Sequence, residues 1–287
     1  MKEKILTLAV QKSGRLSEGS IGLLKKCGIR IQNGTNHLKA RARGFPLELI
    51  FLRDDDIPQY VEDGVAAAGI LGLNEVLEKN KKVEVIRPLG FSRCRLSVAV
   101  PEKTEYQTSE GLNGKRIATS YPYLLEQFLA KNNIKAEIHA ISGSVEVTPG
   151  LGLADAIFEI VSSGGTLLSN GLKEVEKVME SEAVIIARPG LPSEIKDLLD
   201  QLLFRIAAVQ RAENNKYILL NAPGDKLDTI TKLLPGVKSP TIMPLAMEGW
   251  FSLHSVVSED DFWDIIDKLK AAGAEGILVV PIEKMVT

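Results

Sequence analysis

The sequence predicts an α/β protein with a two-lobed N-terminal part and a smaller C-terminal domain, and three observations support this fold class. Its 287 residues are enough for two or three domains. Over about the first 210 residues, short apolar strands alternate with amphipathic helices, as in a parallel or mixed sheet. The last part of the chain follows the order βαββαβ, which is the ferredoxin-like pattern.

Composition excludes several classes of protein. Hydrophobic residues make up 45% of the chain and charged residues 25%, which is ordinary for a globular protein. The formal net charge of −2, with no block of one sign, gives no reason to expect nucleic-acid binding. The first apolar run is interrupted by Gln11 and Lys12, too early for a signal peptide, and no run approaches the roughly 18 residues of a membrane helix. We expect a cytoplasmic protein with no membrane partner.

Cysteine and histidine usage gives no sign of a metal site. The chain has only Cys27 and Cys94, which lack CxxC spacing and stand among apolar residues, so we expect buried free thiols. The three histidines are scattered and have no partner at metal-ligand spacing. No metal site made by the protein alone is expected.

Each lobe is expected to contain its own strands and helices. Strands are predicted at 5–10, 47–52, 66–71 and 83–89 in the first lobe, and at 95–100, 116–120 and 137–141 in the second. Helices are predicted at about 16–27, 124–131 and 193–212. We expect the first lobe to comprise residues 1–92 and 182–214, the second 93–181, and the C-terminal domain 215–287.

The run Ser162-Ser163-Gly164-Gly165-Thr166, here called the glycine loop, directly follows an apolar strand. Backbone N–H groups left unpaired by a tight turn of small residues bind phosphate, and the hydroxyls of Ser163 and Thr166 add donors. Asp155 and Glu159, just upstream, are candidates to accept hydrogen bonds from sugar hydroxyls. The combination suits a ribose 5-phosphate. Taken alone, the loop is equally typical of an ordinary strand-to-helix turn.

Two further loops carry cations at the ends of predicted strands. Lys12-Ser13-Gly14-Arg15 lies between a strand and a helix, which makes it a second candidate anion site; the alternative is a simple turn with a solvated arginine. Arg53 directly follows the strand 47–52, at the carboxyl end of the strand, where open α/β sheets bind their ligands. The three aspartates after Arg53 are explained by helix capping and the helix dipole, but Arg53 is not. In the strand 66–71, small residues would let backbone approach a ligand closely.

The residues around the glycine loop resemble a known signature. Glu146 is followed six residues later by Gly152, and the pattern continues through Ala154, Ile157, Ile160, Ser163-Gly164 and Thr166-Leu167. This pattern resembles that of the ATP phosphoribosyltransferases, the enzymes that open histidine biosynthesis, and the loop resembles the phosphoribosyl-diphosphate (PRPP) loop of phosphoribosyltransferases. The resemblance covers essentially the whole chain and is closest to the long form of the family.

The resemblance implies both a fold and an activity. It implies two lobes of the type II periplasmic-binding-protein architecture, followed by a ferredoxin-like regulatory domain. The implied reaction transfers the phosphoribosyl group of PRPP to ATP, giving phosphoribosyl-ATP and diphosphate, with Mg²⁺ held mainly by the substrate diphosphate. The implied assembly is a homo-oligomer, active as a dimer and inhibited as a hexamer.

The resemblance also implies roles for individual residues. Those implied to bind PRPP are Asp155, Glu159, Ser162, Ser163, Gly164, Gly165, Thr166 and Leu167. Those implied to bind ATP are Lys12, Ser13, Gly14, Arg15, Gly69 and Leu71. Arg53 and Arg15 are implied to be catalytic through their charge on the phosphates. Two departures stand out, since the family usually has Asp where this chain has Glu159 and Ala67.

The C-terminal domain carries no catalytic constellation, so regulation or assembly is its expected role. Strands are predicted at 217–221, 240–244, 250–256 and 276–281, and helices at 225–233 and 259–271. The resemblance implies that histidine binds there, between neighbouring subunits, and inhibits. The candidate contacts are Asn221, Thr241, Val256 and Gly276, and Asn221 stands where some members have Asp.

Other chemistries are less consistent with the sequence. It contains no GxSxG elbow, no P-loop and no GxGxxG motif. Paired glycosidase carboxylates are a poor second interpretation of Asp155 and Glu159, because a phosphate-type loop follows them directly. The alternative to an enzyme is a non-enzymatic sensor that binds an amino acid. A sensor function would not explain the glycine loop or the two loops that carry Arg15 and Arg53.

Overall fold

The computed structural model describes residues 4–31, 38–234 and 239–286. Contacts within the chain define two compact units, Met1–Leu199 and Asp200–Thr287. The N-terminal unit contains a seven-stranded and a five-stranded sheet, and the C-terminal unit contains a four-stranded sheet. Across the described ranges, no helix is both long and apolar enough to cross a membrane.

The first sheet has the strand order β2-β3-β4-β1-β5-β12-β6. Its strands are β1 (Leu6–Gln11), β2 (Arg30–Ile31), β3 (Lys39–Arg43), β4 (Leu47–Leu52), β5 (Ala68–Gly72), β6 (Glu84–Pro88) and β12 (Ala183–Ala187). The neighbours β4, β1 and β5 are parallel, so their carboxyl ends lie at one edge. Their near-continuous apolar sequences suit strands that are buried on both faces. Strand β12 comes from much later in the chain and pairs antiparallel with β5 and β6.

The second sheet has the order β11-β7-β10-β8-β9. Its strands are β7 (Cys94–Pro101), β8 (Arg116–Thr119), β9 (Glu137–Ala140), β10 (Ala156–Val161) and β11 (Leu172–Ser181). Strands β8, β9 and β10 are parallel, and β7 runs antiparallel to both β10 and β11. The parallel trio again gathers three strand ends at one edge of a sheet.

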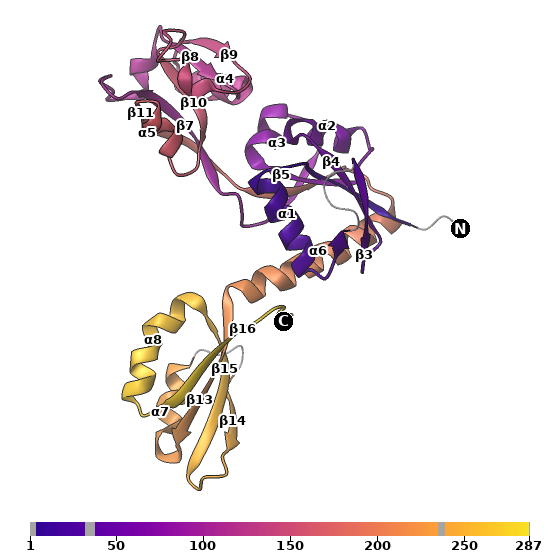
Figure 1. The fold of residues 1–287 in the computed structure, drawn as a ribbon, viewed down its shortest axis with the longest axis vertical. Coiled ribbons are helices and arrows are strands. Elements are labelled where there is room, and N and C mark those ends of the chain that lie inside the picture. The colour runs from indigo at the N-terminus through magenta and orange to yellow at the C-terminus, as the bar shows by residue number, and fades with distance from the viewer. Residues whose placement is uncertain (1–3, 32–37, 235–238, 287) are drawn as a thin grey trace. The chain divides into compact units, whose positions relative to one another are not determined.

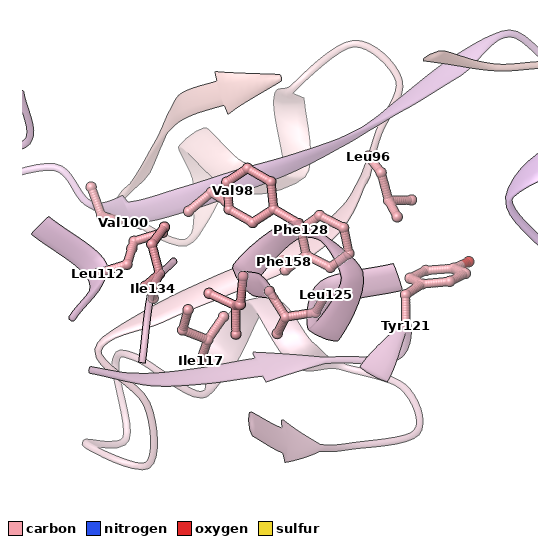
Figure 2. Close-up of a cluster of buried hydrophobic side chains, with 12 residues drawn as sticks. Leu96, Val98, Val100, Leu112, Ile117, Tyr121, Leu125, Phe128, Ile134 and Phe158 are labelled. Atoms are coloured by element: carbon pink, nitrogen blue, oxygen red, sulfur yellow. The ribbon is translucent and has the colours of Figure 1, made fainter. Parts of the chain in front are cut away.

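The hydrophobic core of the second sheet holds β10 from both faces. On one face, Phe158 stacks on Phe128, with ring centroids 6.4 Å apart, inside the cluster shown in Figure 2. On the other face, Ile157 and Val161 belong to a second buried cluster. A strand packed on both sides gives a rigid support for the loop that follows it.

Eight α-helices lie in the described residues, and each is labelled in Figure 1. In the N-terminal unit they are α1 (Arg15–Lys26), α2 (Ile57–Glu62), α3 (Leu73–Lys79), α4 (Pro122–Lys131) and α5 (Gly165–Ser169). Helix α6 (Ser193–Glu213) begins in this unit and ends in the C-terminal one, which contains α7 (Leu227–Leu233) and α8 (Glu259–Ala271). Ser258 caps α8 by accepting a hydrogen bond from the N–H of Asp261.

The C-terminal sheet is antiparallel with the order β14-β15-β13-β16. Its strands are β13 (Asn215–Pro223), β14 (Thr241–Pro244), β15 (Trp250–Ser258) and β16 (Glu275–Pro281). Together with α7 and α8 they follow the order βαββαβ. The expected fold class, a two-lobed α/β unit with a ferredoxin-like C-terminal domain, is therefore confirmed. The limits of the two lobes remain a prediction.

Candidate functional site

Two of the predicted loops meet at the carboxyl edge of the first sheet. Gln11 and Leu52 are register partners at the ends of β1 and β4, and the N–H of Lys12 donates to the carbonyl of Leu52 at 2.8 Å. The loop that contains Lys12 therefore lies beside Arg53. Gly14 has φ +87°, a conformation that glycine adopts without strain, and this turns the chain into α1.

The cations at this edge are available to a ligand. Arg53 has a side chain that is 76% exposed, and its Nε lies 3.3 Å from Oδ1 of Asp55. Lys12 and Arg15 are exposed as well, and Arg15 is the first residue of α1. The structure thus brings together the three basic residues that were expected to contact phosphates.

Two residues predicted to bind ATP, Gly69 and Leu71, lie in the buried strand β5. Leu71 is fully buried. A Cβ atom on Gly69 would lie 2.5 Å from Cγ2 of Ile57, so this glycine lets α2 pack closely against the strand. Both residues therefore pack in the core, and because Val10 and Ile70 are register partners, Leu71 lies beside Gln11, just before the loop of Lys12. Their contact with ATP stays a prediction.

The glycine loop lies at the carboxyl edge of the second sheet and is anchored at both ends. Val161 before it and Leu167 after it are buried in the same apolar cluster. Gly164 has φ +83°, and α5 begins at Gly165. Leu167 is therefore an anchor of the loop, while Ser163, Gly164, Gly165 and Thr166 form the turn itself. The first N–H groups of the short helix have no partner within it.

Glu159 lies on the same strand as the loop, close to its start. Its carboxylate accepts hydrogen bonds from the hydroxyl of Ser120 at 2.8 Å and from the N–H of Ile160 at 2.9 Å. Burial raises the pKa of Glu159 above its ordinary value, and the nearby charge of Glu146 acts in the same direction. Ser120 follows β8, the parallel neighbour of β10, so the two strand ends bring these side chains together.

Asp155 lies at the opposite end of β10 from the glycine loop. The six residues of the strand separate them by about 20 Å. Its carboxylate pairs with Arg116, with Oδ1 3.0 Å from Nη2, and these hydrogen bonds hold the pKa of Asp155 below its ordinary value. The structure does not bring Asp155 together with the other predicted PRPP residues.

A buried polar cluster joins α3 to the start of α4 and was not predicted from the sequence. The amide of Asn74 donates to the hydroxyl of Tyr121 at 3.2 Å and accepts from Ser181 at 2.7 Å. Glu75 is hydrogen-bonded to Tyr121, and burial raises its pKa to about 7. Figure 2 shows the Tyr121 ring at one end of the apolar cluster, with its hydroxyl pointing away.

The same helix α3 also caps α4. The carboxylate of Glu78 accepts hydrogen bonds from the N–H groups of Tyr123 and Leu124, both at 3.0 Å. These are first-turn donors of α4 that otherwise have no partner in the helix. The sequence signal was weak, because the cap comes from a residue about 45 positions earlier in the chain.

A cavity of about 450 Å³ adjoins the glycine loop. Its lining includes Ser162, the first loop residue, together with Arg93, Cys94 and Arg95 from the start of β7. Burial raises the pKa of the Cys94 thiol. Arg93 and Arg95 were not predicted as site residues, although two arginines at the start of a strand are a charge signal that could have identified them.

The four predicted histidine contacts lie on one face of the C-terminal sheet. Along β13, Asn221 alternates with the buried Leu220 and Ala222, so it points away from the core. Val256 lies on the same outward face of β15, and Thr241 is exposed at the start of β14. Gly276 has φ +56°, and a Cβ there would lie 3.2 Å from the Asn221 amide. Asn221 and Gly276 are thus neighbours on this face.

The chain is similar to known proteins along nearly its whole length. A family described as ATP phosphoribosyltransferase matches residues 53–208, and one described as the HisG C-terminal domain matches residues 212–284. The ATP phosphoribosyltransferase of Cytophaga hutchinsonii is 62% identical over 98% of this chain and 99% of its own. That of Bacteroides thetaiotaomicron is 57% identical over 98% of this chain and all of its own.

A solved structure of an ATP phosphoribosyl transferase shares this fold. A chain of the ATP phosphoribosyl transferase (HisG:HisZ) complex from Thermotoga maritima superposes with a TM-score of 0.60 and 25% identity. The match covers 71% of this chain and 99% of that one. The alkanesulfonate-binding protein SsuA from Xanthomonas axonopodis pv. citri matches with 15% identity and a TM-score of 0.47, over 70% of this chain and 71% of its own.

Proposed function

The chain belongs to the ATP phosphoribosyltransferase family, and from this premise we propose how its residues carry out phosphoribosyl transfer from PRPP to ATP. The observation that carries the proposal is the glycine loop, which is anchored at both ends at the carboxyl edge of a parallel sheet. Ligands of open α/β sheets bind at such edges. A sensor that only binds an amino acid would not need this loop.

The glycine loop binds the 5-phosphate of PRPP. The N–H groups of Ser163 to Thr166 and the two hydroxyls are the donors. Glu159, fixed by Ser120, accepts hydrogen bonds from the ribose hydroxyls. Its longer side chain, compared with the usual Asp, is accommodated because Ser120 and the Ile160 N–H hold the carboxylate back. Asp155 has no part in this contact, because it pairs with Arg116 at the other end of the strand.

Arg53, Arg15 and Lys12 stabilise the negative charge of the diphosphate and of the ATP phosphates. In the reaction, a ring nitrogen of adenine uses its lone pair to form the C1–N bond. The C1–O bond of PRPP breaks, and its electron pair leaves with diphosphate. Neutral adenine already has this lone pair, so attack needs no prior proton removal. Catalysis is then mainly positioning and charge stabilisation.

Mg²⁺ suits this site when it is bound mainly by the substrate diphosphate rather than by a cage of protein ligands. In the described part of the chain, no group of three or more His, Cys, Asp or Glu side chains is arranged to hold a metal ion. Glu159 and Glu146 are close enough for their charges to interact, and carboxylate oxygens are ligands that Mg²⁺ accepts. An Mg²⁺ ion on the diphosphate would neutralise its charge, with most ligands from phosphate and water.

The C-terminal unit binds histidine and transmits inhibition. The support is the shared outward face of Asn221, Thr241, Val256 and Gly276, together with the match to the HisG C-terminal domain. A neighbouring subunit would complete this open site, which favours a homo-oligomer. The resemblance to the long form of the family implies that this oligomer is a dimer when active and a hexamer when inhibited.

The experiment that tests the catalytic proposal measures turnover of ATP and PRPP in the presence of Mg²⁺ by the rate at which diphosphate is released. Arg53→Ala removes the positive charge that is proposed to stabilise the leaving diphosphate. The substitution is expected to lower kcat/KM by about 10²- to 10³-fold, with transfer still detectable. Lys25→Ala serves as the matched control, because it removes an exposed cation from the last turn of α1, ten residues or about 15 Å along the helix from Arg15. Wild-type turnover in Arg53→Ala would remove Arg53 from the mechanism.

A further inference from the structure

The first residue of the glycine loop is held by Arg95 of the neighbouring strand β7. Nη1 of Arg95 donates to the carbonyl oxygen of Ser162 at 2.9 Å. Nε and Nη2 of the same guanidinium donate to the two carboxylate oxygens of Glu174, each at 2.5 Å. Ser97 donates to this carboxylate as well, at 2.8 Å. The guanidinium is therefore fixed in place while it holds the loop.

Holding the Ser162 carbonyl orients the next donor of the loop. In a trans peptide, the C=O and the N–H of one unit point to opposite sides, and no cis peptide occurs in the described chain. The N–H of Ser163 therefore points away from Arg95. Within the described residues this N–H has no hydrogen-bond partner, so it is available to a ligand.

We propose that Arg95 and Glu174 are positioning residues that fix the backbone of the glycine loop in the geometry that binds the 5-phosphate of PRPP. The inference rests on the function proposed above for the loop. The guanidinium holds the pKa of Glu174 below its ordinary value, so the carboxylate is charged at neutral pH. The pair therefore carries no net charge, and its contribution is orientation rather than attraction of phosphate.

The opposite end of β10 provides a natural control. There Arg116 pairs with Asp155 through Nε and Nη2, at 3.3 and 3.0 Å, and its Nη1 donates to the carbonyl of Gly152 at 2.9 Å. The kinds of contact are the same, and the side chains are exposed to a similar extent. The exposed fractions are 39% for Arg116 and 36% for Asp155. They are 31% for Arg95 and 25% for Glu174. Only the Arg95 pair holds the glycine loop.

The test is calorimetric titration of PRPP with Mg²⁺ into the full-length protein and four variants, with thermal unfolding of each. Arg95→Gln, Arg95→Lys and Glu174→Gln are expected to raise the Kd for PRPP about 10-fold, the value of one charge-assisted hydrogen bond. Arg116→Gln is expected to leave this Kd within about 2-fold. In turnover, KM for PRPP should rise in the first three variants while KM for ATP stays the same.

Glu174→Gln separates positioning from simple attraction. If Arg95 acted by its charge, removal of the neighbouring carboxylate would strengthen PRPP binding. Tighter or unchanged binding in folded Glu174→Gln, or equal Kd values for Arg95→Gln and Arg116→Gln, would overturn the inference. Failure of the unsubstituted protein to bind PRPP would instead overturn the function proposed for the loop, and the inference with it.

Discussion

At the scale of single residues, Glu159 and Asp155 show how surroundings decide what a carboxylate does. Both are on or next to β10, four positions apart, so the sequence alone makes them look like a pair. On a strand, four positions correspond to about 13 Å. Burial raises the pKa of Glu159 near the loop, whereas Arg116 lowers the pKa of Asp155 at the far end. The sequence identified both carboxylates but could not show which of them lies near the glycine loop.

The buried Glu75 gives a prediction for stability against pH. Its pKa is raised from 4.5 to about 7, mainly by burial, with Asp54 and Asp55 adding to the shift and Tyr121 and Lys79 opposing it. Between these two pH values, Glu75 therefore keeps its proton in the folded state but has released it in the unfolded state. Folding stability should fall as pH rises from about 4.5 to 7, by roughly 1 to 3 kcal/mol.

The measurement is urea unfolding from pH 5 to 8 of the wild type and Glu75→Gln. The amide of glutamine stays neutral, so the variant is expected to lose this part of the pH dependence and to be more stable than the wild type at pH 8. Identical slopes of stability against pH in the two proteins would show that Glu75 is charged in the folded state.

At the scale of elements, most strands and helices were predicted within one or two residues, and the exceptions have physical reasons. The helix 259–271 and the strand 47–52 were predicted at their observed bounds, because their apolar periodicity is clear. Strand β3 was missed because its sequence, KARAR, alternates charged residues only with alanine. Helix α3 was missed because it is seven residues long and follows β5 with no side-chain cap.

The contact between β5 and α2 gives a second prediction. Gly69→Ala would place a Cβ atom 2.5 Å from Ile57 in a buried interface, so we expect a loss of about 1 to 3 kcal/mol of folding stability. Gly22→Ala, in the interior of α1 with open space around its Cβ position, is the matched control and should gain about 0.5 to 1 kcal/mol. Chemical denaturation measures both, and a neutral Gly69→Ala would show that the interface can adjust.

At the scale of the whole molecule, the protein consists of a unit that carries the reaction and a unit proposed to regulate it. The sequence predicted this division because the order of elements changes from alternating strands and helices to βαββαβ near residue 215. It could not show the cluster of Asn74, Glu75 and Tyr121, whose members come from distant segments. Such contacts depend on tertiary packing and leave no local pattern.

The regulatory proposal predicts a separation of inhibition from catalysis. Asn221→Ala removes an amide from the outward face of the C-terminal sheet, and it is expected to raise the histidine concentration for half-inhibition by about 10-fold or more. Turnover without histidine is the reference for each protein. Ser255→Ala, a buried position on the inner face of the neighbouring strand, tests whether any change in this sheet has the same effect. Unchanged inhibition in Asn221→Ala would place the inhibitor elsewhere.

The central claim is that the glycine loop binds the monoester phosphate of PRPP. The most direct measurement is a crystal structure of the protein with PRPP, Mg²⁺ and a non-reactive ATP analogue. The account predicts that the 5-phosphate oxygens lie about 3 Å from the backbone nitrogens of residues 163–166, with Arg53 near the diphosphate. A 5-phosphate bound at the loop of Lys12 to Arg15, with the glycine loop empty, would contradict it.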